Sequence, residues 1–520
     1  MKKIINGKIL TVDENFTIAQ AIAIEGDRIK AVGTTEEIMN IQSPDAEIID
    51  LGGKTVIPGL IDNHTHYFRG VQYWPFEVLL DAVSTRKEAV EKIINKGKTS
   101  NPGEWVICIG GWNVGQFRDS NEDFKREELD RLVPNNPAYL QYGFEGGYGN
   151  SQALKILGLD SPDGYVGAGT MRMGNFVGLP EAIREAQPEY DAAKWKKEYL
   201  ARANRDYNRA GITALWDADA IHYENKFVDW LQEYIEENDG WTNVRHFQNI
   251  KSDAHTPEVA AEVREKVRNH PPLEKGDYFR LHSLGEMIYR PVYDINRTGW
   301  TFTPSQEDLD IYRQNLVVAA EKRWPVIDHT MTTEKADIVL DIYESVDREY
   351  DIKPLRWAFH HCDTFQRKHF ERMKKFNMFG GMHVGHMTMR ARKIDQPPMR
   401  TAQEVGIMWG SGTDSKIVSP YPAFFILYVL VTGKNVRGDV FLPNQTVSRE
   451  EALISYTRAN AWALFMEDDL GTLEPGKYAD LVVLNKDYMT CPEDEIRDIE
   501  SLLTLVGGRV GYEAGLLPEA

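Results

Sequence analysis

Cysteine is scarce in this chain of 520 residues, which carries only Cys108, Cys362 and Cys491. The three lie far apart and none belongs to a Cys-x-x-Cys pair, so a disulfide framework is not expected. A zinc site made of four thiolates is excluded because there is no fourth cysteine. Any metal ion must therefore be bound through histidine and carboxylate side chains.

Long hydrophobic runs are also missing. The most apolar stretch, residues 423–431, is much shorter than the roughly 20 residues that a membrane-spanning helix needs. Two lysines near the N-terminus are not followed by the apolar segment of a signal peptide. We therefore expect a cytoplasmic protein that has no membrane partner.

Positive charge is in deficit, since 60 Lys and Arg face 79 Asp and Glu, for a net charge of -19. An acidic surface repels a phosphate backbone, so no nucleic-acid partner is expected. The hydrophobic content of 42% is ordinary for a globular protein and argues against disorder. The length suits one large domain with a smaller one. The oligomeric state stays open, with a homodimer as one alternative.

The middle of the chain alternates apolar strands with helical patterns. Three helical patterns and the strands beside them cover residues 309–323, 334–350 and 364–376, and 325–328, 355–359, 378–382 and 405–409. This alternation predicts an α/β fold with parallel strands and crossover helices. Residues 59–469 are enough for a (β/α)8 TIM-like barrel, which typically needs about 250, with an inserted subdomain at roughly 71–210.

Both ends of the chain consist of short strands separated by turn residues. Asn6-Gly7 and Gly26-Asp27 interrupt alternating runs near the N-terminus. Residues 479–484 and 501–510 are strands with no helix between them. We therefore expect residues 1–58 and 470–520 to form one small β-sandwich domain beside the barrel.

An apolar strand that starts at Ile57 ends in His64-Thr65-His66. Residues two apart on a strand point to the same face, so both imidazoles can converge on one ion. Imidazole is a common ligand for zinc, iron and nickel. Because barrel enzymes carry their active sites at the carboxyl ends of the strands, the pattern predicts a metal site and not two surface histidines.

Three later strand ends carry similar groups, namely His329, the pair His360-His361, and Asp414. Taken singly, a histidine at a strand end is more often structural, and Asp414 could be a helix N-cap. Together with the His-x-His pair they place a metal-binding group at four strand ends of one barrel mouth. Chance is a poor account of such a set.

Several motifs resemble those of the amidohydrolase superfamily, and within it the amidohydrolase-3 or YtcJ-like branch. The motifs are NGKILTVD at 6–13, IEGDRIKAVG at 24–33, VIPGLIDNHTH at 56–66, TRANA at 457–461, GTLEPGKYADLVVL at 471–484 and, for the narrower branch, NSQAL at 150–154. The resemblance covers nearly the whole chain. It implies a metal-dependent hydrolase.

The resemblance also implies a role for individual residues. His64 and His66 match the metal-binding pair of the first strand, and His329 matches the ligand of the fifth. His361 matches the sixth-strand histidine, which binds a second metal or orients the substrate. Asp414 matches the eighth-strand aspartate, which binds metal and shuttles the proton of the nucleophilic water. His361 and Asp414 are therefore expected to be catalytic as well as metal-binding.

Two departures from the branch concern the number of metal ions. Arg280 stands where the branch usually has a lysine whose carbamate bridges two metals, and arginine cannot do so. Glu145 stands where the branch usually has a histidine. Either Glu145 or Glu286 could supply a bridging carboxylate, or the bridge could be absent. The sequence favours one ion over two, with zinc expected and manganese or iron as alternatives.

Other residues are candidates for supporting roles. His360 stands where the branch usually has an acidic residue, and strand alternation would let only one of His360 and His361 face the metal. It could bridge or support the metal ligands. Candidate substrate contacts are Arg280, His282, His383, His386 and Trp112, although a tryptophan is more often a core residue.

Such a site would hydrolyse a C–N bond of a small molecule, in an amide, carbamate, cyclic amide or N-substituted formamide, with a water activated by the metal. Asp414 would act first as general base and then as general acid. Deamination, ester hydrolysis, isomerisation or decarboxylation on the same site are alternatives, because fold and metal do not fix the substrate. A catalytically inactive binding or scaffold protein is a remoter alternative, which the retained histidines and Asp414 disfavour.

Overall fold

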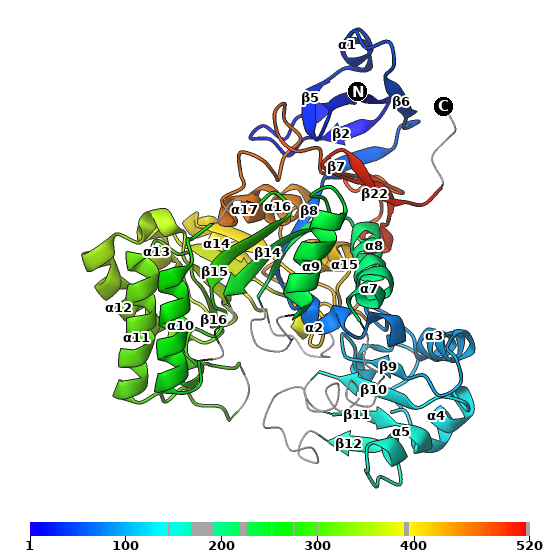
Figure 1. Ribbon diagram of the computed structural model, residues 1–520, viewed down its shortest axis with the longest axis vertical. Coiled ribbons are helices and arrows are strands. Elements are labelled where there is room, and N and C mark those ends of the chain that lie inside the picture. Colours follow the sequence, from blue (N-terminus) through cyan, green and yellow to red (C-terminus); the bar gives the residue numbers. More distant parts are fainter. Residues whose placement is uncertain are drawn as a thin grey trace.

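The computed structural model describes the chain except for residues 144–145, 168–190, 219–225, 251, 253, 274–275, 297–298, 389–394 and 516–520. Figure 1 shows the sheets built from the chain ends at the top, an inserted α/β region at the lower right, and parallel strands with their helices between them.

Two four-stranded parallel sheets form the central part. The first has the order β15-β14-β13-β8, with β8 (Leu60–Thr65), β13 (Ile212–Asp217), β14 (Arg245–Ile250) and β15 (Phe279–Leu284). The second has the order β16-β17-β18-β19, with β16 (Ile327–Thr330), β17 (Ala358–His361), β18 (Phe379–Met382) and β19 (Met408–Ser411). The predicted α/β class is confirmed.

Hydrogen bonds connect the edges of the two sheets at both seams. At one seam the Leu284 amide donates to the Pro325 carbonyl over 3.0 Å, and at the other the Asp414 amide donates to the His64 carbonyl over 2.8 Å. Isolated parallel bridges lie at both seams. Because every pairing is parallel, the carboxyl ends of all eight strands lie at one rim.

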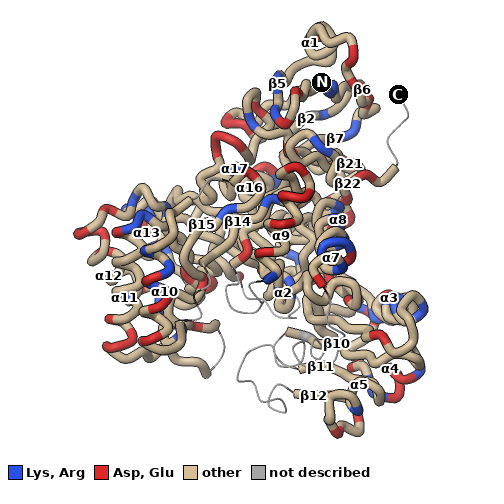
Figure 2. The backbone as a smooth tube through the Cα atoms, viewed as in Figure 1, with Lys and Arg blue, Asp and Glu red and all other residues tan. Residues whose placement is uncertain are grey.

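The helices that follow the strands cover the outside of the sheets, as the helical periodicity predicts. They include α11 (Gln306–Glu321), α12 (Thr333–Tyr350) and α13 (Arg367–Lys375). Ser305 caps α11 in a capping box with Asp308, which satisfies two backbone donors at the helix start. α12 buries Val339, Leu340 and Tyr343, whereas Asp341 and Glu349 are exposed. Lys, Arg, Asp and Glu are interspersed along the outer helices α10 (Pro257–Asn269) to α13 (Figure 2).

The two ends of the chain meet in one six-stranded sheet with the order β22-β21-β20-β7-β2-β3. Its strands are β2 (Lys8–Leu10), β3 (Ile18–Ala19), β7 (Thr55–Pro58), β20 (Leu481–Leu484), β21 (Ser501–Val506) and β22 (Arg509–Glu513). A four-stranded sheet of order β5-β4-β1-β6 comprises β1 (Lys2–Ile5), β4 (Ala21–Glu25), β5 (Arg28–Gly33) and β6 (Glu47–Asp50). Ile4 and Ile24 of the smaller sheet share a buried cluster with Val56 and Leu481 of the larger one.

The inserted region has a sheet of its own, with the order β12-β11-β10-β9. Its elements are α3 (Arg86–Thr99), β9 (Val106–Cys108), α4 (Arg126–Leu132), β10 (Ala138–Tyr142), β11 (Gly146–Gly149), α5 (Ser151–Ile156) and β12 (Tyr165–Gly167). A separate buried cluster around Val106, Trp112 and Leu140 packs this region. The chain returns through α8 (Ala201–Arg209) to β13.

Among the described residues, no helix combines the length and the apolar character that crossing a lipid bilayer requires. The most apolar helix, α15 (Ala423–Thr432), is packed into the protein, with Phe425 and Leu427 fully buried.

Candidate metal centre

Histidine and carboxylate side chains from several strand ends meet at the carboxyl rim. Six of them are at most 7% exposed: His64 and His66 at the end of β8, Glu286 after β15, His329 on β16, His361 on β17 and Asp414 after β19. The five ligands predicted from strand ends and resemblance therefore lie together, and Glu286 joins them.

One group of possible ligands consists of His64, His66 and Asp414. His66 Nε2 lies 3.0 Å from Asp414 Oδ1, and His64 Nε2 lies 3.6 Å from the same oxygen. Their ligand atoms all lie within 4.8 Å of one another. A single cation could therefore touch all three side chains after small adjustments of the rings.

A second group consists of Glu286, His329 and His361. His329 Nδ1 lies 3.0 Å from Glu286 Oε2, and His361 Nε2 lies 3.9 Å from it. The second imidazole nitrogen of His329 and the Nδ1 atom of His361 are buried and have no hydrogen-bond partner among the described residues. Buried nitrogens without partners are costly, and a bound cation would satisfy them.

Glu286 connects the two groups. Its Oε2 atom lies 3.6 Å from His64 Nε2 in the first group and 3.0 Å from His329 Nδ1 in the second. It is therefore placed where a carboxylate could bridge two ions. Glu145, the other bridging candidate, lies outside the described residues.

Electrostatics favour a cation at this place. Burial would raise the pKa of Glu286, but the hydrogen bond with His329 and the nearby ring of His361 hold its pKa well below the usual range. Burial would also raise the pKa of Asp414, but the hydrogen bond between Asp414 and His66 keeps that pKa below the usual range. Although burial opposes the charged ring, the nearby carboxylates of Glu286 and Asp414 raise the pKa of His361 to about 9. Two buried carboxylates thus require positive charge beside them.

The ends of β8 and β19 approach closely because residue 412 is glycine. A Cβ atom at Gly412 would lie 2.5 Å from Asn63 Oδ1 and 2.7 Å from the His64 amide nitrogen. Asp62 joins the same strand ends, since its carboxylate accepts from the amides of His64 and Thr413 at 3.2 and 2.9 Å. A larger residue at 412 would move the segment that carries Asp414 away from His64.

A buried chain of amides orients His383, which follows β18. Asn460 Nδ2 donates to the carbonyls of Ile61 and Ser411 at 2.6 and 2.9 Å. Its Oδ1 must therefore accept from Asn63 Nδ2 at 2.8 Å. Asn63 Oδ1 is then left to accept the hydrogen of His383 Nε2 at 3.1 Å. The neutral ring consequently carries a lone pair on Nδ1.

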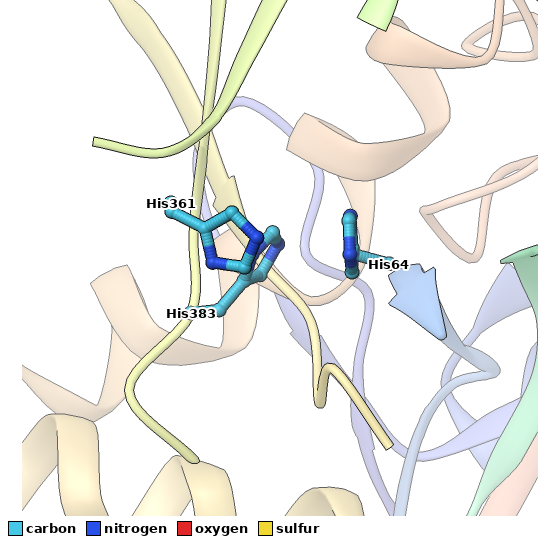
Figure 3. A group of neighbouring side chains, drawn as sticks. All are labelled: His64, His361 and His383. Carbon is cyan, nitrogen blue, oxygen red and sulfur yellow. The ribbon is translucent and has the colours of Figure 1, made fainter. Parts of the chain in front are cut away.

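His383 belongs to a third possible ligand group with His64 and His361. Figure 3 shows the rings of His361 and His383 next to each other, with His64 facing them from β8. Burial holds the pKa of His383 well below its usual range, so the ring is neutral. It can serve as a ligand or as an acceptor for a substrate N–H or O–H group.

His386 is held at the edge of the cluster. Its Nε2 lies 3.5 Å from Asp363 Oδ2, which also accepts from Asn296 Nδ2 at 3.0 Å. It forms a possible ligand group with His361 and Asp414. Sequence reasoning misses Asp363, although its position two residues after His361 is a usable signal.

Tyr293 is a second residue that sequence reasoning misses. Its ring stacks on His329 with centroids 4.4 Å apart, and burial raises its pKa above the usual range. It lies in the long connection between β15 and α11. This connection has no helical or strand periodicity from which the orientation of the side chain could be predicted. No signal in the sequence identifies it.

Three predicted substrate contacts lie away from the cluster. Arg280 lies nearer the start of β15, with its guanidinium 5.6 Å from the ring of Phe247. His282 is buried edge-on against Trp216, with centroids 4.6 Å apart. Trp112 is fully buried in the core of the inserted region. These side chains pack along the middle of a strand or in the core of the inserted region. The sequence pattern does not distinguish such positions from positions at the carboxyl ends of the strands.

A buried ion cluster joins the inserted region to the segment after Asp414. Lys416 Nζ lies 3.0 Å from Asp81 Oδ2 and 3.3 Å from Glu77 Oε1, and all three side chains are at most 2% exposed. Burial would lower the pKa of Lys416, but the two carboxylates hold it well above the usual range. The inserted region therefore packs directly against the segment that carries Asp414.

Two relatives align with nearly the whole of the chain. The chain is 27% identical to the N-substituted formamide deformylase of Arthrobacter pascens over an alignment of 566 residues that covers 98% of each chain. It is 23% identical to the putative amidohydrolase YtcJ of Bacillus subtilis (strain 168), again with 98% of each chain covered.

Solved structures show the same fold. An uncharacterized metal-dependent hydrolase from Pyrococcus furiosus aligns with a TM-score of 0.63 and 20% identity, over 94% of this chain and 100% of that one. Atrazine chlorohydrolase TrzN from Arthrobacter aurescens, complexed with zinc, aligns with a TM-score of 0.54 and 15% identity, over 100% and 97% of the two chains.

The rim of histidines and carboxylates could hold a divalent metal ion. Together with the family match and the similarity to a deformylase, it identifies the chain as a metal-dependent hydrolase that acts on C–N bonds. The sequence profile of the amidohydrolase family matches residues 47–512, and the chain belongs to this family. The predicted membership of the family is thereby confirmed.

Proposed function

We propose that the chain hydrolyses an amide-type C–N bond of a small molecule, with N-substituted formamides as the first substrate class to test. The observation that carries the proposal is the meeting of His64, His66, His329, His361 and Asp414 around Glu286. The formamide class is supported by the deformylase of Arthrobacter pascens, which aligns along nearly the whole of both chains.

The donor set suits a divalent ion such as zinc, with manganese or iron as alternatives, because it consists of imidazoles and carboxylates. His64, His66 and Asp414 would hold one ion, and His329 and His361 a second. Glu286 would bridge them, since it reaches both groups within 4 Å. The geometry therefore supports two ions. The sequence alone favours one, because position 280 lacks the lysine whose carbamate could bridge a pair.

When bound, a divalent ion lowers the pKa of its water towards about 7 and polarises the substrate carbonyl. Asp414 supplies the acid–base chemistry of the chain. Its Oδ1 lies 3.0 Å from His66 Nε2, on the side where both would hold the ion, which leaves Oδ2 to accept the proton of the attacking water. Asp414 can then return the proton to the departing nitrogen, so that an amine is released. His361, which reaches both carboxylates, is placed to orient the substrate oxygen.

The same evidence supports a finer description of the fold. We infer that the eight parallel strands form one (β/α)8 barrel within residues 59–469, because hydrogen bonds connect both seams. Residues 1–58 and 470–520 would form a separate β-sandwich, since their two sheets share one core. The insertion at roughly 71–210 would end with α8, which leads back into the barrel at β13.

The decisive experiment measures products and metal together. The purified protein is incubated with an N-substituted formamide, the matching acetamide and a heterocyclic amine, and formate, acetate and ammonia are measured. Formate release that a chelator abolishes and added zinc or manganese restores is the expected result. Ammonia release without a carboxylate would instead favour a deaminase. If the purified protein held only traces of metal and added zinc or manganese restored no activity, a catalytically inactive scaffold would be favoured.

The bridging role of Glu286 is tested by the Glu286→Gln variant. The amide is uncharged and cannot bridge two cations as a carboxylate does, so we expect the bound metal to fall by about one equivalent per chain. Metal is measured by elemental analysis after removal of loosely bound ions. Glu334→Gln, on the exposed first turn of α12, is the matched control. An unchanged metal content in Glu286→Gln would exclude the bridge.

A further inference from the structure

The rings of His64 and His360 meet through their Nδ1 atoms, which lie 2.6 Å apart. Both side chains are fully buried, and the ring planes are inclined by 52°. At this distance one Nδ1 atom must carry a hydrogen and the other must accept it, because two lone pairs or two N–H groups would repel each other. Neutral rings therefore have only two arrangements, one with His64 as donor and one with His360 as donor.

The opposite nitrogen of His64 decides between the two arrangements. His64 Nε2 lies 3.6 Å from oxygens of both Glu286 and Asp414, and it has no hydrogen-bond partner among the described residues. If His64 accepted at Nδ1, its hydrogen would be on Nε2, and that nitrogen could not bind a cation. If His64 donates at Nδ1, Nε2 offers a lone pair to the ion.

We propose that His360 is a positioning residue that accepts the Nδ1 hydrogen of His64 and thereby fixes His64 Nε2 as a metal ligand. This inference rests on the metal site of the proposed function. It gives His360 a role distinct from that of His361, which lies next to it but reaches Glu286 and Asp414 directly. His361 ends β17 with a φ of 79°, so its backbone is not extended. The rule that neighbouring strand residues point to opposite faces therefore does not apply to this pair.

The neighbouring strand leaves room for His360. Gly381 is its pairing partner on β18, and a Cβ atom there would lie 2.7 Å from His360 Cδ2 and 2.9 Å from its Nε2. Trp216 meets the same ring edge-on, with centroids 5.3 Å apart. Any side chain at position 381 would displace the ring and lengthen its contact with His64.

The acceptor in this pair is neutral. Metal-binding histidines usually donate their second N–H group to a carboxylate, a backbone carbonyl or water. A carboxylate at position 360 would add a third buried negative charge beside Glu286 and Asp414, which like-charge repulsion disfavours. An imidazole fixes the same tautomer of His64 without that charge.

The test compares His360→Asn with His360→Leu. Asparagine places Oδ1 where histidine has Nδ1, so it keeps the acceptor, whereas leucine removes it. Zinc affinity is measured by competition with a chelator at fixed pH, and the absorption spectrum of the cobalt-loaded protein reports the ligand geometry independently of turnover. We expect His360→Leu to bind zinc roughly 10–100-fold more weakly with an altered cobalt spectrum, and His360→Asn to stay close to the unchanged protein.

His246→Leu is the matched control, because His246 is also a buried histidine on a barrel strand but packs against Tyr67 and Phe68. It should keep its zinc affinity. Unchanged affinity in His360→Leu, or equal losses in the leucine and asparagine variants, would overturn the role of the acceptor. If the unchanged protein itself bound no zinc, manganese or iron, the proposed function would fail before this comparison.

Discussion

The Asp414→Asn variant is expected to turn over its substrate roughly 10²–10⁴ times more slowly than the unchanged protein, which is the usual range for loss of a general acid–base group. Asparagine keeps an oxygen that can still touch the ion, but it cannot take a proton from water. The loss should therefore appear in kcat, with little change in KM. Steady-state kinetics on the substrate found in the product assay provide the measurement.

Metal content must be determined on the same preparations of the Asp414→Asn variant. If most of the metal is retained while turnover is lost, the proton-shuttle role of Asp414 is supported. A variant with full activity would exclude that role. A variant that lost both metal and activity would show that Asp414 acts mainly as a ligand.

The Lys416→Met variant is expected to be destabilised by about 3–5 kcal/mol, because it leaves the carboxylates of Glu77 and Asp81 buried without their cation. The effect follows from geometry, since both oxygens lie within 3.3 Å of the ammonium group and all three side chains are buried away from water. The denaturation midpoint in urea, followed by tryptophan fluorescence, measures the loss.

Lys434→Met is the control for this substitution. Lys434 pairs with Asp494 at 2.7 Å, but 27% of the lysine side chain and 65% of the aspartate side chain are exposed. Surface ion pairs of this kind contribute at most about 1 kcal/mol. Equal midpoints for the two variants would mean that the cluster around Lys416 does not hold the inserted region to the parallel sheets.

The side chains that meet at the rim are easier to predict than the residues that support them. His64, His66, His329, His361 and Asp414 each end an apolar run, and parallel strands bring such ends to one rim. Glu286 can be predicted only as one of two bridging candidates, because Gly285 interrupts the strand pattern before it. The direction of a loop carboxylate depends on packing that periodicity does not encode.

One predicted helix matches the structure more closely than the strand that follows it. The predicted helix 334–350 is confirmed as α12, whereas the predicted strand 355–359 begins at Ala358. Residues Lys353–Leu355 form a short 3-10 turn, and Arg356 has a φ of 50°. Apolar residues in such a turn look like strand residues in the sequence, but their backbone is not extended.

The six-stranded sheet also has a consequence for synthesis of the protein. Pro58 of β7 pairs with Leu481 of β20, so the neighbour of an early strand is made almost last. At about 5–20 residues per second, β7 waits roughly 20–85 s on the ribosome for that partner. During this time its backbone groups are an open edge that another nascent chain could pair with. Slower translation would lengthen the exposure, and chaperone demand during expression should rise accordingly.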